Sequence, residues 1–382
     1  MQPQLSVFYP NPITLQALES ATKGIFITSP NPRVGCIIIG PTGAVIGQGH
    51  TQRAGGPHAE IMALRDAQAQ GRSVKGATAY VTLEPCSHHG RTGPCCDALI
   101  AAGIKRVVST NTDPNPLVSG QSFARLRAAG IEVDVLPPDN PLAIQARELN
   151  IGFFSRMVRK KPWVRMKMAA SLDGQTALQN GVSQWITGDA ARTDGHAWRA
   201  RACAVLTGIG TVLADNPKLD VRLVDTPRQP HLVIVDSQLE TPLDAALFIA
   251  GRACFIYAAA PNDEKKAALE ARGATVIYMP GETPGTQAKV DLDAMLFDLA
   301  KREINELHVE AGHKLNGSFI REGLVDEFLV YLAPKLLGLG QGMANFGPLT
   351  TLTDAVNLKF HSVERVGDDV RMVARPPGRD KF

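Results

Sequence analysis

Two short segments of the chain carry residue types that bind and use zinc. Residues 58–60 read His-Ala-Glu, and residues 85–95 read Pro-Cys-Ser-His-His-Gly-Arg-Thr-Gly-Pro-Cys. His58, Cys86 and Cys95 supply one imidazole and two thiolates, which leaves a fourth zinc position for water. Structural zinc is normally held by four protein ligands, whereas hydrolytic zinc keeps a water position. The sequence therefore predicts a catalytic zinc site.

Glu60 stands two residues after the histidine, where its carboxylate can move protons between the water and a leaving group, as in zinc deaminases of nucleobases. The Pro-Cys-x-x-Cys spacing of those enzymes is lengthened here, and spacing does not decide between Cys95 and Cys96 as the third ligand. A structural zinc, or cysteines that only fill a core, are the alternatives. Three histidines are further candidate ligands or polar contacts near the pocket: His50, His88 and His89.

Length and composition exclude several classes of protein. At roughly 100–200 residues per domain, 382 residues predict two or three domains. The formal net charge is only +3 and neither sign forms a long run, which argues against a nucleic-acid partner. No stretch approaches the roughly 20 apolar residues that span a bilayer. The chain starts without the pattern of a signal peptide and two of its cysteines are candidate metal ligands, so we expect a cytoplasmic protein.

The first ~150 residues alternate apolar runs with helical patterns, which predicts an α/β domain whose sheet is covered by helices. Strands are expected at Gly35–Ile39, Ala44–Gly49, Ala79–Leu83, Arg106–Ser109 and Ile131–Val135. Helices are expected at Leu15–Lys23, His58–Gln70, Cys95–Ala102 and Gln121–Ala129. Two of these helices begin at proposed ligands, so their positive ends would favour thiolates and hydroxide. A further helical segment, Leu142–Lys161, marks the predicted domain boundary.

A new pattern of strands, loops and helices begins at about Pro162. Strands are expected at Trp163–Ala169, His231–Asp236, Cys254–Ala258, Glu306–Glu310 and Glu327–Leu332, and helices at Ala190–Ala202 and Leu292–Arg302. Two glycine clusters follow apolar runs, at 207–212 and 310–318. The first lacks the third glycine of the dinucleotide fingerprint, because Leu213 occupies that position. Each cluster could hold phosphates at a helix start, or could be an ordinary turn.

Longer motifs occur in the order seen in a known family. In the first half these are His58-Ala-Glu60, Glu84-Pro-Cys-Ser-His-His-Gly-Arg-Thr-Gly-Pro-Cys-Cys96 and Asp113-Pro-Asn-Pro-Leu-Val-Ser-Gly120. In the second half they are Ala170-Ser-Leu-Asp-Gly174, Ser183-Gln-Trp-Ile-Thr187, Gly210-Thr-Val-Leu-Ala-Asp-Asn-Pro217, Val235-Asp-Ser237, Val309-Glu-Ala-Gly312 and Ala333-Pro-Lys-Leu-Leu-Gly338. Over nearly its whole length the chain resembles the bifunctional pyrimidine deaminase/reductase of riboflavin biosynthesis. Gly93 stands where that family usually has a proline, which predicts a slightly looser loop.

The resemblance implies an α/β fold class with a cytidine-deaminase-like domain at residues 1–153 and a dihydrofolate-reductase-like reductase domain at residues 154–382. The first domain would bind one zinc ion and remove the 2-amino group of 2,5-diamino-6-(5-phosphoribosylamino)pyrimidin-4(3H)-one. The second would reduce the ribosyl chain of the product to ribityl with NADPH. The expected partners are this small-molecule phosphoriboside and a second copy of the chain in a homo-oligomer, with no nucleic acid and no membrane.

The resemblance also implies roles for residues at matching positions. The deaminase pocket would contain Asn31, His88, Arg91, Asp113 and Asn115, with Glu60 as the catalytic acid and base. The NADPH site would be lined by Ala169, Trp185, Thr211, Asp215, Ser237 and the loop from Gly312 to Ser318. The reductase substrate would contact Lys167, Ser183, Arg199, Leu219, Arg222 and Glu310. Guanidinium groups suit a ribose phosphate, and Asp215 and Glu310 are candidate acid residues near the reacting ribose. Turn formation alone is the alternative for Asn31, Asp113, Asn115 and Asp215.

Two other functional classes fit the zinc residues alone. A nucleoside or transfer-RNA deaminase would use the same ligands, but the near-neutral charge argues against RNA. The long insertion between Cys86 and Cys95 argues against a simple nucleoside substrate. A non-catalytic protein with a structural zinc would have no use for an ionisable carboxylate at Glu60.

Overall fold

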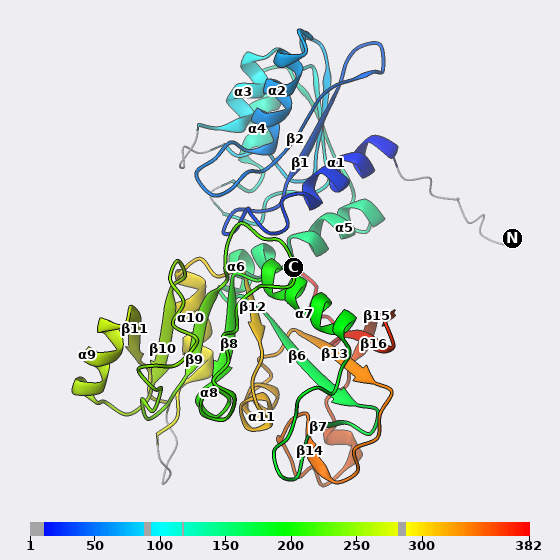
Figure 1. Ribbon diagram of the computed structural model, residues 1–382. Coiled ribbons are helices and arrows are strands. Elements are labelled where there is room, and N and C mark those ends of the chain that lie inside the picture. The colour runs from blue at the N-terminus through cyan, green and yellow to red at the C-terminus, as the bar shows by residue number, and fades with distance from the viewer. Residues whose placement is uncertain (1–10, 88–92, 117, 282–287) are drawn as a thin grey trace, which may run out of the picture. The chain divides into compact units, whose positions relative to one another are not determined.

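The computed structural model describes residues 11–87, 93–116, 118–281 and 288–382 of the chain. The chain divides into two compact units, Met1–Arg159 and Lys160–Phe382, and each is described by itself (Figure 1). The boundary predicted between residues 153 and 154 lies inside helix α6 (Ile151–Arg159). Phe153 and Phe154 of this helix are buried in the core of the first unit, so the units divide at the end of α6.

The first unit contains a five-stranded sheet in its described part, in the order β2-β1-β3-β4-β5. Its strands are β1 (Gly35–Ile39), β2 (Val45–His50), β3 (Thr78–Val81), β4 (Arg106–Ser109) and β5 (Glu132–Val135). Its helices are α1 (Pro12–Thr22), α2 (Ala59–Ala69), α3 (Cys95–Ala101), α4 (Gln121–Ala128), α5 (Pro141–Leu149) and α6 (Ile151–Arg159). Strand β1 pairs antiparallel with β2 and β3, whereas β3, β4 and β5 are parallel.

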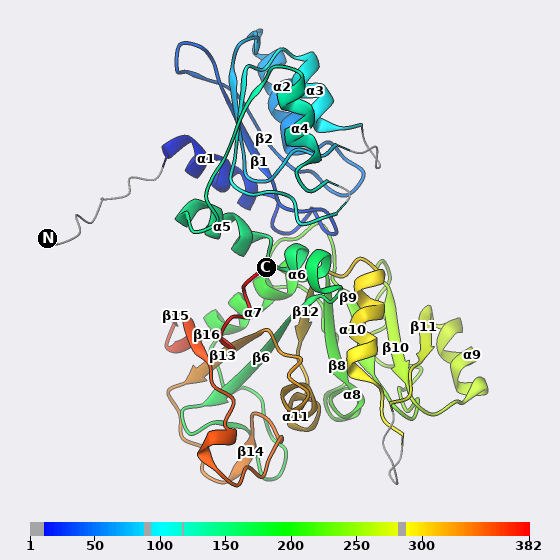
Figure 2. The same ribbon diagram turned by 180° about the vertical axis from the view of Figure 1, so that it is seen from behind.

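Helices cover both faces of this sheet. In Figures 1 and 2, α2, α3 and α4 gather on one side of it and α1 and α5 on the other. Small residues let α2 approach the sheet closely. Ala59, Ala63 and Ala67 recur every four residues and are fully buried, and a Cβ at Gly49 of β2 would lie 2.5 Å from the Ala59 carbonyl oxygen. The start of α2 is therefore held against the sheet.

The helical segment predicted at Leu142–Lys161 is two helices, α5 and α6, rather than one. The break falls at Asn150, which is the C-cap residue of α5. Its side-chain oxygen accepts the Arg33 main-chain N–H at 2.7 Å, and its amide donates to the Arg33 carbonyl at 2.9 Å. An asparagine side chain that bonds main-chain groups competes with the helix, and local periodicity did not reveal this distant partner.

In its described residues, the second unit contains a nine-stranded sheet in the order β11-β10-β9-β8-β12-β6-β13-β16-β15. Strands β14 and β7 form a separate two-stranded sheet. Its strands are β6 (Trp163–Ser171), β7 (Gln175–Leu178), β8 (Ala204–Gly208), β9 (His231–Val235), β10 (Cys254–Ala258), β11 (Ala274–Tyr278), β12 (Glu306–Val309), β13 (Glu327–Ala333), β14 (Gly340–Gly342), β15 (Lys359–Val366) and β16 (Asp369–Arg375). Its helices are α7 (Asp189–Arg201), α8 (Ile209–Asp215), α9 (Asp263–Ala271), α10 (Leu292–Lys301) and α11 (His313–Arg321), with a 3-10 turn at Leu352–Asp354.

Strands β6 and β8 to β13 run parallel to one another, whereas β16 is antiparallel to both of its neighbours, β13 and β15. Alternate residues of the parallel strands enter two different cores: Leu206 and Val233 pack with α10 and α11, and Val205 and Leu232 pack on the other face with α8 and α9. This period of two explains why the strands are buried on both faces. The carboxyl ends of parallel strands share one edge of a sheet, where ligands commonly bind.

No helix within the described ranges is both long enough and apolar enough to cross a membrane.

Candidate functional site

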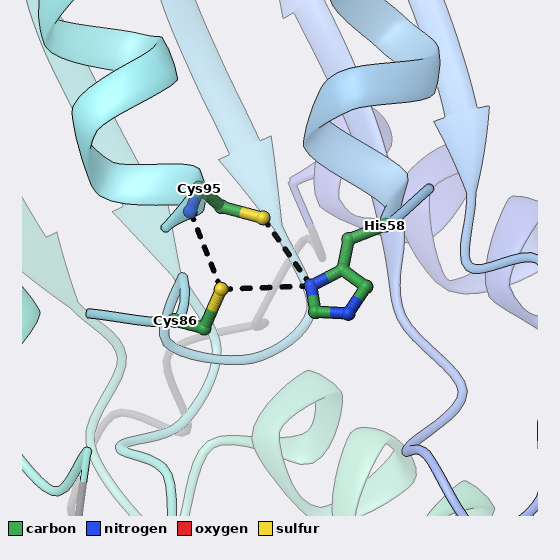
Figure 3. Close-up of side chains that lie close together, drawn as sticks. All are labelled: His58, Cys86 and Cys95. Carbon is green, nitrogen blue, oxygen red and sulfur yellow. Dashed lines mark hydrogen bonds between the residues drawn. The ribbon is translucent and has the colours of Figure 1, made fainter. Parts of the chain in front are cut away.

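Three predicted zinc ligands meet at one point in the first unit. The Nδ1 atom of His58 lies 3.5 Å from the Cys86 sulfur and 3.3 Å from the Cys95 sulfur, as Figure 3 shows. Cys95 also donates its main-chain N–H to the Cys86 sulfur at 3.2 Å. One nitrogen and two sulfurs thus lie within 4.8 Å of one another.

These separations fit a zinc ion. With ordinary zinc–nitrogen and zinc–sulfur bond lengths, tetrahedral ligands stand about 3.6 Å apart. Cys96, the alternative third ligand, has its sulfur 3.6 Å from its neighbour Asp97 Oδ1 instead. Cys95 is therefore the cysteine whose sulfur faces the other two ligand atoms.

Secondary structure explains why these residues converge. His58 is the N-cap residue of α2, and Cys95 is the first residue of α3. Cys86 lies in the loop after β3, and the Cys96 main-chain N–H, which bonds the Cys86 carbonyl at 3.2 Å, ties this loop to α3. Two helix starts thus direct partial positive charge towards the sulfurs, and such charge favours thiolates.

The titratable groups at this point shift one another's pKa values. The Cys95 thiol beside Cys86 lowers the pKa of Cys86 to about 4, against the effect of burial. The neighbouring Cys86 sulfur and burial raise the pKa of Cys95, so Cys86 is the sulfur that ionises more readily. Burial raises the pKa of Glu60, whose residue is 3% exposed. A raised pKa makes a carboxylate a better proton acceptor, as general acid–base catalysis requires.

A loop after β4 carries two predicted pocket residues. Asp113 is buried, and burial raises its pKa to about 7 although its side chain accepts the Asn115 main-chain N–H at 2.7 Å. The buried side chain of Glu84, two residues before Cys86, accepts the main-chain N–H of Asp113 at 3.1 Å and that of Gly120 at 2.8 Å. Asn31 lies in the loop after α1, and its N–H bonds the Thr28 carbonyl. His88 and Arg91 lie outside the described residues.

The second unit has a large cavity, of about 1930 Å³. The predicted cofactor and substrate positions of the reductase all line it: Lys167, Ala169, Ser183, Trp185, Arg199, Thr211, Asp215, Leu219, Arg222, Ser237, Glu310, Gly312 and Ser318. They come from β6, α7 and the segments that follow β7, β8, β9 and β12. One cavity therefore gathers residues that lie up to about two thirds of the unit apart in sequence.

The two glycine clusters lie close together and both line this cavity. Gly208 ends β8 and caps α8, and Gly312 caps α11. A Cβ at Gly208 would lie 3.0 Å from the Leu315 side chain of α11. Both helices thus begin at the cavity lining, and the main-chain N–H groups of a first helical turn can bind phosphate.

Charged groups form a cluster on another part of the cavity lining. Arg199 makes two hydrogen bonds to the Glu310 carboxylate, through Nε and, at 2.9 Å, through Nη2. The Lys167 ammonium lies 3.8 Å from the same carboxylate. Burial alone would raise the pKa of Glu310, but Arg199, His308 and Lys167 hold it well below its usual range. Burial lowers the pKa of Lys167.

Sequence reasoning gave no role to two residues at these sites. Glu84 belongs to the quoted Glu-Pro-Cys motif, but its bonds to a loop about 30 residues away have no local signal. His196 also lines the cavity. It lies three residues before Arg199 on the predicted helix, so the helical spacing could have placed both on one face.

Comparison with known proteins covers both units. Two protein-family models match the chain. The model described as "Cytidine and deoxycytidylate deaminase zinc-binding region" matches residues 12–111, and the model described as "RibD C-terminal domain" matches residues 162–372. The Riboflavin biosynthesis protein RibD of Escherichia coli is 44% identical over 369 residues, which is 93% of this chain and 96% of that protein. The chain belongs to the RibD family.

Other RibD relatives agree in sequence and structure. The Aquifex aeolicus protein is 41% identical over 93% of this chain and 95% of its own length. The structure of Acinetobacter baumannii RibD has a TM-score of 0.84 at 39% identity, with 96% of this chain and 98% of that chain covered. A Thermotoga maritima structure has a TM-score of 0.81 at 33% identity over 96% and 98% of the two chains. It is described as a diaminohydroxyphosphoribosylaminopyrimidine deaminase/5-amino-6-(5-phosphoribosylamino)uracil reductase.

RibD is a bifunctional enzyme of riboflavin biosynthesis that joins a deaminase domain and a reductase domain. The predicted α/β fold class, with a cytidine-deaminase-like domain before the reductase domain, is confirmed. The predicted deaminase and reductase activities are those of the family.

Proposed function

We propose that His58, Cys86 and Cys95 hold the zinc ion of the deaminase, and that the domain hydrolyses the 2-amino group of 2,5-diamino-6-(5-phosphoribosylamino)pyrimidin-4(3H)-one. Bound zinc lowers the pKa of a water molecule to about 7 and so supplies a nucleophile at neutral pH. Support comes from the ligand separations of 3.3 and 3.5 Å and from the donor set of one imidazole and two thiols.

Glu60 moves protons in this reaction. Its carboxylate is buried beside the ligands, and its raised pKa lets it accept a proton from water and return it to the departing nitrogen. Four predicted pocket residues would shape the pyrimidine and phosphoribosyl site: Asn31, His88, Asp113 and Asn115. The buried position of Asp113 supports its part in this pocket.

The cavity of the second unit is the proposed reductase site. NADPH supplies the hydride when bound. The residues proposed to hold it are Ala169, Trp185, Thr211, Asp215, Ser237, Gly312 and Ser318, and those proposed for the phosphosugar substrate are Lys167, Ser183, Arg199, Leu219, Arg222 and Glu310. The observation that carries this proposal is that all of them line one cavity. Because the protein's share of hydride transfer is binding and orientation, such convergence is what the reaction requires.

Glu310 and Asp215 take different parts in this proposal. The pKa of Glu310 lies well below its usual range, so Glu310 stays ionised and orients Arg199 and the substrate rather than donating a proton. Asp215 remains the candidate acid residue near the reacting ribose. It ends α8 on the cavity lining.

Purified protein, incubated with the diaminopyrimidine phosphoriboside, tests both activities. Ammonia release should occur without NADPH and stop when zinc is removed by a chelator. NADPH oxidation should begin only once the deaminated product is present. If metal-free protein given the diamino substrate consumes NADPH as fast as the zinc-loaded protein does, the proposed order of the two steps is wrong.

We also propose a cytoplasmic homo-oligomer. Two cysteine ligands need a compartment that keeps thiols reduced, and all six cysteines of the chain are free of disulfides. The edge strand β15 exposes Phe360 and Val363, at 70% and 57%. Exposed apolar groups on an edge strand favour pairing with another chain. Light scattering should report a mass above 40.9 kDa, and a monomer would contradict this part of the proposal.

A further inference from the structure

His196 faces the reductase cavity without a role in the proposed function. It lies on α7 one helical turn before Arg199, and both residues line the cavity. Its residue is 5% exposed, so its ring nitrogens contact protein groups and the cavity rather than open solvent. Which nitrogen carries the hydrogen therefore decides what this side chain can bind.

The contacts of His196 determine that tautomer. The main-chain N–H of Arg222 points to Nδ1 at 3.1 Å, and a main-chain N–H can only donate. Nδ1 is therefore the acceptor, and in a neutral imidazole the hydrogen lies on Nε2. Burial, and after it the charges of Arg199 and Arg222, lower the pKa of His196 to about 4. The ring is neutral at physiological pH.

The Nε2–H group then meets another donor. Nε2 lies 3.5 Å from Nη1 of Arg199, and a guanidinium nitrogen cannot accept. Three other Arg199 hydrogens have acceptors: Glu310 binds Nε and Nη2, and the Asp220 carbonyl binds Nη1 at 3.0 Å. The second Nη1 hydrogen then points at Nε2, which carries a hydrogen of its own, so neither nitrogen accepts from the other. An oxygen about 2.9 Å from both nitrogens would satisfy the two donors.

The surrounding charges favour an anionic oxygen. The charged groups that act on His196 are Arg199, Arg222, Glu310 and Asp220, and Lys167 lies beside Glu310. Arg199 pairs with Glu310 and Arg222 pairs with Asp220, and Lys167 is the third cation; the Arg222 side chain is half exposed, so it can exchange Asp220 for a ligand. Three cations against two carboxylates leave an excess of positive charge next to the paired donors.

We propose that His196 is a substrate-binding residue of the reductase, and that its Nε2–H and the Nη1–H of Arg199 together bind one phosphate oxygen of the phosphosugar. The inference rests on the proposed function, which assigns Arg199 to the substrate. A neutral donor beside a guanidinium adds a directed hydrogen bond without a second buried charge. A hydrogen bond to a charged group is worth enough to change affinity about 10- to 100-fold.

Two substitutions in the full-length protein separate binding from folding. His196→Leu removes both ring nitrogens, whereas His196→Gln keeps an oxygen for the Arg222 N–H and an amide N–H for the ligand. We expect His196→Leu to raise the KM for the deaminated substrate about 10- to 100-fold with kcat nearly unchanged. His196→Gln should stay within a few-fold of the parent. Inhibition by ribose 5-phosphate should weaken in step with KM, while ammonia release stays normal.

His231 provides a matched control in the same unit. Its Nδ1 also accepts a main-chain N–H, from Ala253 at 3.2 Å, but the residue is not among those lining the cavity. His231→Leu should lower thermal stability without the selective rise in KM. An unchanged KM in His196→Leu would overturn the proposal. So would a weaker NADPH Kd with a normal substrate KM, because the phosphate would then be the cofactor's. Absence of any NADPH-dependent reduction by the parent protein would instead refute the proposed function.

Discussion

Replacement of Glu84 by glutamine tests how the zinc loop is joined to the pyrimidine pocket. The Glu84 side chain is buried, at 3% exposure, and accepts four hydrogen bonds. Oε2 accepts the main-chain N–H of Asp113 at 3.1 Å and that of Gly120 at 2.8 Å. Oε1 accepts the main-chain N–H of Ser122 at 3.2 Å and its hydroxyl at 2.7 Å. A single carboxylate thus holds the loop after β4 beside Cys86.

The energetic cost follows from the geometry. Glutamine has one oxygen, so its NH2 group must face two of the four donors. The Ser122 hydroxyl can rotate and become an acceptor, but the Ser122 main-chain N–H then loses its partner. An unsatisfied buried donor costs about 1–3 kcal/mol, and the two bonds that remain to a neutral oxygen each lose about 1 kcal/mol. We expect Glu84→Gln to lower the free energy of unfolding by about 3–5 kcal/mol.

Denaturant unfolding of the full-length protein measures this change, and Ser122→Ala is the matched control. That variant removes one hydroxyl bond and leaves the three main-chain bonds, so it should cost about 1 kcal/mol. Under native conditions Glu84→Gln should raise the KM for deamination, because Asp113 loses its support, while NADPH-dependent reduction remains normal. Equal losses of stability in Glu84→Gln and Ser122→Ala would refute the reasoning.

Four further predictions concern the two proposed sites. Cys95→Ala should lose zinc and Cys96→Ala should keep it, as measured by metal analysis, and the reverse result would exchange their roles. Glu60→Gln should keep zinc while ammonia release falls about 10²- to 10⁴-fold; a normal rate in the metal-loaded variant would remove Glu60 from the mechanism. Asp215→Asn should bind NADPH nearly normally but reduce the substrate far more slowly, whereas a parental rate with lower thermal stability would favour a turn role. The pKa of His196 is about 4 against an ordinary 6.5, so the unfolded chain binds more protons between these values. Stability should therefore fall as the pH drops from 6.5 towards 4, and His196→Gln should reduce this slope in calorimetry.

Some parts of the fold could be predicted because they depend on neighbouring residues. The strands Gly35–Ile39 and Arg106–Ser109 have the bounds expected from their apolar runs, and the start of α3 is at Cys95 as expected. Strand β15 was not predicted, since it is an edge strand with most side chains exposed and shows no apolar alternation. Its pairing with β16 is a tertiary contact.

The sequence by itself determined the chemistry of the zinc site. Imidazole, thiol and carboxyl groups in His-Ala-Glu and Pro-Cys motifs are typical of a catalytic zinc site. His58 and Cys95 stand at helix starts that the local sequence pattern predicts. Spacing did not distinguish Cys95 from Cys96. Neighbouring side chains on a helix point in different directions, and the loop that carries Cys86 decides which sulfur it meets. In the structure, the Cys95 sulfur lies 3.3 Å from His58.

Tertiary structure alone decided how the reductase groups combine. Lys167, Arg199 and Glu310 come from β6, α7 and the end of β12, and only the order of the parallel strands brings them together. The sequence also could not reveal that Glu310 is held ionised or that the hydrogen of His196 lies on Nε2. Both depend on burial and on donors more than 25 residues away. A pKa or a tautomer is set by such distant contacts, which local sequence patterns do not encode.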